Sequence, residues 1–136
     1  TIQSKKGWYD GIKFASQLEV YMYKQLQAND VEFGYETERF DIIDGFHSDN
    51  VSFERTATKD FINRGEKKIR GIYYTPDFVS DKFIIETKGR ANESFPVRWK
   101  LFKRLLHLNN DMRVIYKPQS KADCDVAVKD ILKRFY

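Results

Sequence analysis

Two short apolar runs contain or precede charged residues. The spacing of these residues would suit a reaction at a phosphate group. The sequence reads YTPDFV over residues 74–79 and FIIETKG over residues 83–89. Because side chains alternate along a strand, Glu86 and Lys88 are predicted to point to one side and Thr87 to the other. Asp77 would then lie within reach of Glu86 across a hairpin. The pattern predicts two carboxylates and an ammonium group that converge at the edge of a core.

Two carboxylates held together in apolar surroundings need compensation. A buried charge is costly unless it is paired or bound to an ion, and neighbouring acids raise each other's pKa. An oxygen-rich site of this kind suits Mg²⁺, with Mn²⁺ as a substitute, because both ions keep several waters and accept a phosphate oxygen. Such a site can hydrolyse a phosphodiester with activated water, with Lys88 balancing charge on the phosphate. The alternative is a structural Glu86–Lys88 pair beside a Pro-Asp turn.

The elements that must position these residues follow from hydrophobic periodicity and turn signals. Apolar residues recur every four positions near the start of the chain, which predicts a helix over about 14–28. Aromatic and β-branched runs bounded by turn residues predict strands. The expected order is a helix at 14–28, a strand at 31–43 bent at Gly34, a polar insertion at about 44–71 with a short strand at 51–55, strands at 72–79 and 83–88, a helix whose first turn holds Pro96, a strand at 113–116 and a final helix.

The spacing of the acids resembles a known motif. Pro76-Asp77, followed after eight residues by Glu86-Thr87-Lys88, is similar to the motif of the PD-(D/E)XK nuclease superfamily. Within it, YTPDF and ETKG resemble the phage endonuclease I family of Holliday-junction resolvases. The segment YDGIKFASQLE at 9–19 resembles the start of a family of phage-encoded proteins with a predicted nuclease fold. The 44–71 stretch departs from the resolvases and leaves the substrate and the dimer geometry open.

The resemblance implies further site residues. A glutamate on the first helix completes the metal site in this superfamily, and Glu19 is the matching position. The competing interpretation is a capping box formed by Ser16 and Glu19, in which the glutamate only satisfies backbone N–H groups. The resemblance also implies that the backbone carbonyl of Thr87 binds the metal.

Basic residues near the motif are candidate DNA contacts. Gly89 either allows close approach of a phosphate backbone or simply ends a strand. A cluster of bases on and before the predicted second helix either contacts phosphates or forms a solvated face. The insertion is either a DNA-contacting arm or a disordered loop. The candidate DNA-binding residues are Gly89, Arg90, Arg98, Lys100, Lys103, Lys67 and Lys68.

Composition limits the classes of protein. The chain has 136 residues and a net charge of +4, and 41% of its residues are hydrophobic, which suits one folded domain and excludes a disordered protein. No apolar run is long enough for a membrane helix. A single cysteine, Cys124, is expected to be a partly buried residue of the last helix and favours an intracellular location, the host cytoplasm if the chain is phage-encoded. No phosphate-cradling glycine loop is present, so no nucleotide cofactor is expected.

These observations together predict one α/β domain over residues 1–136, with a mixed central sheet flanked by helices in a PD-(D/E)XK, restriction-endonuclease-like core. The expected activity is Mg²⁺-dependent endonucleolytic cleavage of DNA. The resemblance implies branched DNA, including Holliday junctions, as the substrate. A homodimer is expected because symmetric cleavage needs two active sites. The alternatives are a nuclease for ordinary duplex or single-stranded DNA, or a non-catalytic DNA-binding protein whose acids are structural.

Overall fold

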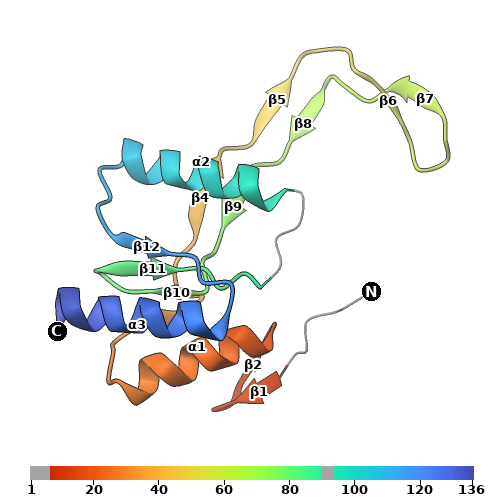
Figure 1. Cartoon of the computed structure of the whole chain (residues 1–136). Coiled ribbons are helices and arrows are strands. Elements are labelled where there is room, and N and C mark those ends of the chain that lie inside the picture. The colour runs from red at the N-terminus through yellow and green to blue at the C-terminus, as the bar shows by residue number, and fades with distance from the viewer. Residues whose placement is uncertain (1–6, 90–93) are drawn as a thin grey trace. The chain divides into compact units, whose positions relative to one another are not determined.

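The computed structural model describes residues 7–89 and 94–136. The chain forms two compact units. The first, here called the core unit, comprises Thr1–Arg39 and Thr75–Tyr136, and the second, here called the arm, comprises Phe40–Tyr74. The expected α/β class is confirmed, because the described residues form three helices and several small sheets (Figure 1).

A four-stranded mixed sheet forms the centre of the core unit, in the order β12-β11-β10-β3. β10 (Phe78–Val79) pairs antiparallel with both β3 (Gly34–Tyr35) and β11 (Phe83–Ile85). β11 in turn pairs in parallel with β12 (Val114–Tyr116). β10 and β11 are buried throughout, as their uninterrupted apolar composition predicts.

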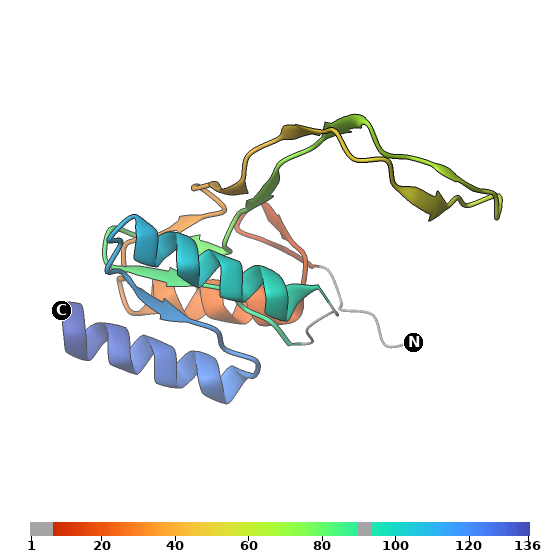
Figure 2. The same cartoon turned by 90° about the horizontal axis from the view of Figure 1, so that it is seen from above.

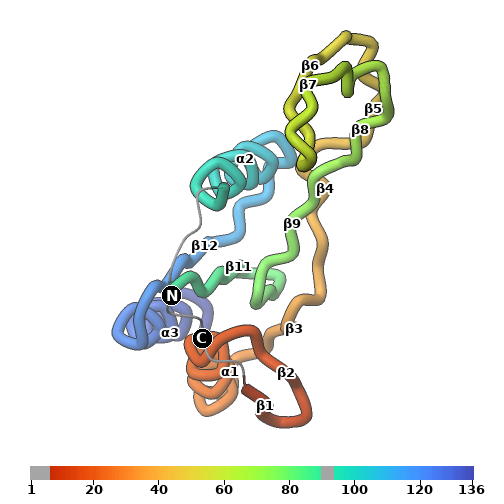
Figure 3. The backbone as a smooth tube through the Cα atoms, turned by 90° about the vertical axis from the view of Figure 1, so that its right-hand side faces the viewer, coloured from red at the N-terminus to blue at the C-terminus, as the bar shows by residue number. Residues whose placement is uncertain are grey.

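Three helices cover the two faces of this sheet. α2 (Phe95–Leu108) lies on one face, and α1 (Gln17–Ala28) lies with α3 (Lys121–Phe135) on the other (Figure 3). α1 and α3 pack against each other and share the main apolar core with the buried strands. Cys124 lies on α3, the last helix, as expected, but is fully buried in this core and not partly buried. Among the described residues, no helix has the length and apolar character needed to cross a membrane.

An N-terminal hairpin precedes α1 and was not predicted. β1 (Gly7–Tyr9) pairs antiparallel with β2 (Ile12–Phe14), and Asp10 and Gly11 between them both have positive φ. A two-residue loop with positive φ at both positions is the type I′ turn that Asp-Gly favours. The Asp-Gly pair between two apolar runs was therefore the sequence signal for this hairpin.

The arm is an antiparallel ribbon of three successive two-stranded sheets (Figure 2). Its strands are β4 (Phe40–Ile43), β5 (Phe46–Ser48), β6 (Phe53–Arg55), β7 (Phe61–Asn63), β8 (Lys67–Ile69) and β9 (Ile72–Tyr74). They pair as β4 with β9, β5 with β8 and β6 with β7. The sequence predicted only the strand near 51–55 within 44–71, whereas the structure has four strands there.

Two long predicted strands are each divided in the structure. The predicted strand at 31–43 becomes β3 and β4, and the one at 72–79 becomes β9 and β10, with the two halves in different sheets. Glu36 causes the first break because its φ of 52° is left-handed and incompatible with a strand. Pro76 lies in the second break, where it cannot donate a ladder hydrogen bond. Both breaks lie beside Asp77, so the backbone around Asp77 is not committed to strand pairing.

Candidate metal centre

Asp77 immediately precedes β10 and is anchored by Thr87, just beyond β11. The Thr87 backbone N–H donates to Oδ2 of Asp77 at 2.8 Å, and the Thr87 hydroxyl donates to the same oxygen at 2.6 Å. Both residues are buried. The prediction that Thr87 points away from the acids was wrong, because β11 ends at Ile85 and strand alternation does not extend to residue 87. The two hydrogen bonds fix the orientation of the Asp77 carboxylate.

Glu19 lies in the first turn of α1, with its side chain held by two hydroxyl groups. Tyr35 on β3 donates to Oε1 of Glu19 at 2.5 Å, and Ser16 donates to Oε2 at 3.2 Å. Ser16 also caps α1 by accepting the Glu19 backbone N–H at 3.2 Å. Part of the predicted capping arrangement is therefore present. The buried Glu19 carboxylate is nevertheless available to the candidate metal centre.

Glu36 is the third acid of the centre, and sequence reasoning did not select it. One carboxylate oxygen from each of Glu19, Glu36 and Asp77 lies within 4.8 Å of the other two. The Glu36 backbone N–H donates to the Asp77 backbone carbonyl at 2.8 Å, so the turn after β3 is tied directly to the Asp77 loop. The only sequence signal for Glu36 was that residues 30–49 hold seven acids and one arginine, which does not separate Glu36 from its neighbours.

Burial, together with the charges of neighbouring acids, raises the pKa values of Asp77 and Glu19. Burial, followed by the charges of Glu86 and Glu19, raises the pKa of Asp77 to about 8, although the hydrogen bonds from Thr87 oppose this shift. Burial also raises the pKa of Glu19, and the charge of Glu36 adds to the effect. The pKa of Tyr35 rises because its hydroxyl is buried and donates to Glu19. The site therefore gathers carboxyl groups whose ionisation is disfavoured in the metal-free chain.

The remaining two predicted motif residues have different surroundings. Glu86 is buried, its backbone N–H donates to the Tyr116 carbonyl at 2.9 Å, and its charge acts on Asp77. The Lys88 ammonium lies 4.8 Å from the centroid of the Phe95 ring and forms no ion pair with any described residue. A structural Glu86–Lys88 ion pair is therefore not formed.

The candidate DNA-binding residues divide between the two units. Arg98, Lys100 and Lys103 are exposed on α2 of the core unit, and Lys67 and Lys68 are exposed on β8 of the arm. Gly89 is exposed, and a Cβ there would approach nothing closer than Leu18 at 4.0 Å, so packing within the chain does not require a glycine. Arg90 lies outside the described residues.

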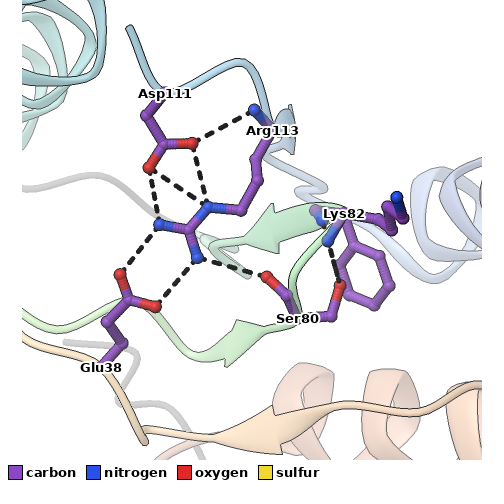
Figure 4. Close-up of polar contacts among 6 residues, drawn as sticks. Glu38, Ser80, Lys82, Asp111 and Arg113 are labelled. Atoms are coloured by element: carbon purple, nitrogen blue, oxygen red, sulfur yellow. Dashed lines mark hydrogen bonds and ion pairs between the residues drawn. The ribbon is translucent and has the colours of Figure 1, made fainter. Parts of the chain in front are cut away.

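An arginine-centred network holds the chain segments next to this centre (Figure 4). Arg113 donates from two guanidinium nitrogens to the Glu38 carboxylate at 2.9 and 2.8 Å, and also donates to Asp111 and to the Ser80 carbonyl. Glu38 follows Glu36 by two residues, Ser80 follows β10, and Arg113 precedes β12. This network, here called the Arg113 clamp, therefore ties the Glu36 turn to the end of β10.

The donor set fits a hard divalent cation. Oxygens bound to one Mg²⁺ ion lie about 3.0 Å apart in adjacent positions and about 4.2 Å apart in opposite positions, since each bond is about 2.1 Å, so the three acids would have to draw closer together to bind one ion. Thr87 binds Oδ2 of Asp77, and no described residue donates to Oδ1. A cation would also offset the mutual repulsion that raises the Asp77 pKa.

Comparison with known proteins gives one match. A family model described as "Protein of unknown function (DUF1064)" matches residues 2–121. The matched range includes all the acids of the candidate metal centre. No curated protein and no solved structure matches the chain.

Proposed function

The chain belongs to the DUF1064 family, and from the geometry of its acidic centre we propose that it is a metal-dependent DNA endonuclease with a PD-(D/E)XK core that acts on branched DNA. The observation that carries the proposal is the meeting of Glu19, Glu36 and Asp77 within 4.8 Å, with buried Glu86 close enough to raise the Asp77 pKa. A purely structural role gives no reason to gather four acids in one place.

The proposed roles follow from the contacts of each residue. Glu19, Glu36 and Asp77 hold the divalent cation, and Glu86 adds negative charge from the end of β11. When bound, Mg²⁺ or Mn²⁺ would polarise the phosphodiester and lower the pKa of a water molecule. Thr87 keeps Asp77 oriented through two donors to one oxygen, and Tyr35 does the same for Glu19. The Thr87 backbone carbonyl is a further candidate ligand.

Lys88, which follows the acidic motif directly, is the proposed source of positive charge for the phosphate. Its ammonium group rests against the face of Phe95, where the ring electrons hold a cation without neutralising it. Because it forms no ion pair with a described residue, it is free to contact a phosphate oxygen and balance charge as the phosphodiester is attacked. Arg98, Lys100 and Lys103 on α2 add a basic face for the remaining phosphates.

The proposed substrate rests on the resemblance of the YTPDF and ETKG segments to the phage resolvases. A homodimer is proposed for the same reason, since paired incisions in a junction need two sites. The rivals are a nuclease for ordinary duplex or single strands and a non-catalytic DNA-binding protein. Substrate preference and metal dependence distinguish these three possibilities.

The deciding experiment incubates the full chain with a four-way junction, a linear duplex and a single strand of matched sequence, each with Mg²⁺, Mn²⁺ or EDTA. We expect Mg²⁺- and Mn²⁺-dependent cleavage of the junction, faster than of the other two substrates, and none in EDTA. Equal rates on all three would leave a general nuclease. Binding without cleavage in either metal would favour the non-catalytic alternative.

Active-site variants show whether the observed cleavage belongs to this chain. Asp77→Asn and Glu86→Gln keep side-chain size while removing charge, so we expect both to lose cleavage and to keep or gain DNA affinity. Lys129→Ala on the exposed face of α3, a residue with no assigned role, is the control and should cleave as the unmodified chain does. Cleavage by Asp77→Asn at the unmodified rate in Mg²⁺ would refute the assigned centre.

A further inference from the structure

A second lysine, Lys117, directly follows β12 and lies alongside the segment that carries Lys88. The parallel ladder of β11 and β12 continues past both strands, because the Lys88 backbone N–H donates to the Pro118 carbonyl at 2.9 Å and that of Glu86 donates to the Tyr116 carbonyl at 2.9 Å. Residues 86–88 therefore run beside residues 116–118. This pairing brings Lys117 alongside the segment that carries the motif.

Lys117 and Lys88 share one aromatic surface. The Lys88 ammonium lies 4.8 Å from the Phe95 ring centroid, and the Lys117 ammonium lies 6.0 Å from the same centroid and 5.7 Å from that of Trp99. Phe95 and Trp99 stack on each other with centroids 5.9 Å apart, and both rings are buried. The rings are fixed by the core, so they hold both flexible lysines in one region.

The charge in this region is uncompensated within the described part of the chain. Neither lysine forms an ion pair with a described residue, and the first turn of α2 carries no acid. Two ammonium groups on one aromatic surface repel each other, and an anion bound between them would offset that repulsion. An aromatic surface supplies no hydrogen-bond acceptor of its own, which leaves the N–H donors of both lysines available for phosphate oxygens.

We propose that Lys117 is a substrate-binding residue that contacts a DNA phosphate next to the one bound by Lys88. The identity of the anion, a phosphodiester, rests on the proposed function. The geometry of the lysine pair does not depend on it. Lys88 follows the acidic motif and serves the reacting phosphate. Lys117 approaches the same rings from the segment after β12 and positions the DNA without taking part in bond cleavage.

The test compares three lysine variants of the full chain. Lys117→Ala removes the proposed contact, Lys117→Arg keeps the charge, and Lys24→Ala is the matched control because Lys24 is also an exposed lysine held over an aromatic ring, 4.6 Å from the Tyr9 centroid. Binding to a labelled four-way junction is measured in Ca²⁺ across a salt series. Melting temperatures establish that all variants fold.

Loss of one phosphate contact reduces the slope of log K against log salt by about 0.9 and weakens binding about fivefold to tenfold at 0.1 M salt. We expect this change for Lys117→Ala alone. In Mg²⁺, its KM should rise while its rate at saturating junction stays within about twofold of the unmodified chain, as expected for a contact equally strong in the ground and transition states. Lys117→Arg should restore most of the affinity.

Two results would overturn the assignment of Lys117: a salt slope unchanged in Lys117→Ala, or an equal loss in Lys24→Ala. Failure of the proposed function is recognised separately. If the unmodified chain binds the junction but does not cleave it in Mg²⁺ or Mn²⁺, the nuclease proposal fails, and the salt slope of Lys117→Ala still decides whether this residue contacts a phosphate.

Discussion

Glu19 has two roles that single substitutions can separate. Its backbone N–H is capped by Ser16, whereas its carboxylate accepts a hydrogen bond from Tyr35 and lies beside Glu36 and Asp77. We expect Glu19→Gln to lower cleavage at least a hundredfold while leaving the melting temperature nearly unchanged, because the amide keeps the hydrogen-bonding shape but is a poor metal ligand. Single-turnover rates and melting curves of the same preparation measure both effects.

Ser16→Ala provides the complementary variant. It removes the side-chain cap of α1, which costs about 0.5–2 kcal/mol of stability, and leaves the carboxylate in place. We expect cleavage at saturating Mg²⁺ to fall far less than in Glu19→Gln. An active but destabilised Glu19→Gln protein would show that Glu19 is a capping residue and not a metal ligand.

Asp77 should make the metal-free protein less stable as the pH rises. Its pKa is about 8 in the folded chain and near 3.8 in the unfolded chain, so the folded state binds the extra proton between these values. The slope of stability against pH is therefore negative in this window: the contribution is complete below about pH 4 and lost as the pH passes about 8. The raised pKa of Glu19 acts in the same direction.

Thermal melting in EDTA between pH 5 and pH 8 measures this effect, and we expect the melting temperature to fall across the range. Asp77→Asn carries no titrating group at this position and should show a flatter profile. Mg²⁺ should stabilise the unmodified chain more at pH 8 than at pH 5.5, because binding must displace a proton at the lower pH. A melting temperature in EDTA that rises steadily to pH 8 would contradict the assignment.

The sequence predicts acids at this centre better than it predicts their exact partners. Glu19, Asp77 and Glu86 were selected from a motif and a resemblance, and the structure buries all three. Glu36 was missed because its role depends on a left-handed backbone and on a hydrogen bond to Asp77, neither of which has a residue-type signature. Thr87 was placed on the wrong side because alternation was applied beyond the end of β11.

At the scale of elements, the Arg113 clamp holds the turn that presents Glu36. The Arg113 side chain is only 15% exposed and satisfies two carboxylates and a backbone carbonyl. Arg113→Ala leaves Glu38 and Asp111 without their shared cation, so we expect a loss of about 1–3 kcal/mol. We also expect weaker Mg²⁺ affinity, because Glu36 lies two residues from Glu38. Chemical denaturation and Mg²⁺ titration of the melting temperature measure these effects.

Arg134→Ala is the control for the Arg113 clamp. Arg134 pairs with Asp130 one turn away on α3, at 2.6 Å, but solvent screens this pair, so it should contribute little to stability. We expect it to leave Mg²⁺ affinity unchanged. If Arg113→Ala were as mild as Arg134→Ala in both measurements, the clamp would have no part in positioning the centre.

The helices and the central strands were predictable because periodicity and burial reinforce each other. The apolar residues of α1 recur at helical spacing, and the apolar stretches of β10 and β11 are uninterrupted because both faces are covered. Strand lengths were overestimated where the chain stays apolar through a break, as between Tyr74 and Phe78. Only the pairing of strands distinguishes such a break from a continuous strand.

At the scale of the whole molecule, the arm is a candidate second DNA contact. Within residues 50–70, six bases face three acids, and Lys67 and Lys68 follow each other on β8. A two-stranded ribbon has dimensions that a DNA major groove admits. We expect Lys67→Ala/Lys68→Ala to weaken junction binding and to reduce the salt slope by about 2 if both lysines contact phosphates. Competition binding in Ca²⁺ across a salt series measures both.

Lys67→Arg/Lys68→Arg preserves the charges and should bind nearly as well as the unmodified chain. The rate at saturating DNA should stay the same in both double variants, because the acidic centre lies wholly in the core unit. An alanine variant with unchanged affinity and salt slope would show that these lysines form only a solvated face.

The arm was the least predictable part because its apolar residues do not mark a core. Among the described residues, eight of the fourteen exposed large apolar side chains lie in it, namely Ile43, Phe46, Val51, Phe53, Phe61, Ile62, Ile72 and Tyr73. Sequence rules infer strands from alternation between buried and solvent faces, and a ribbon with little burial on either face gives no clear alternation. Its regularity comes from backbone pairing between β5 and β8 and between β6 and β7.

The pairing of Phe40 with Tyr74 has a consequence for how this chain can vary. The chain enters the arm at Phe40 and leaves it at Tyr74, and these two residues are directly paired. The residues between them therefore form a single insertion that begins and ends at the same place. A two-residue Asn-Gly turn is enough to join such a pair. Lineages could therefore lengthen, shorten or exchange residues 41–73 without altering the path of the remaining chain. Variation in length should concentrate there.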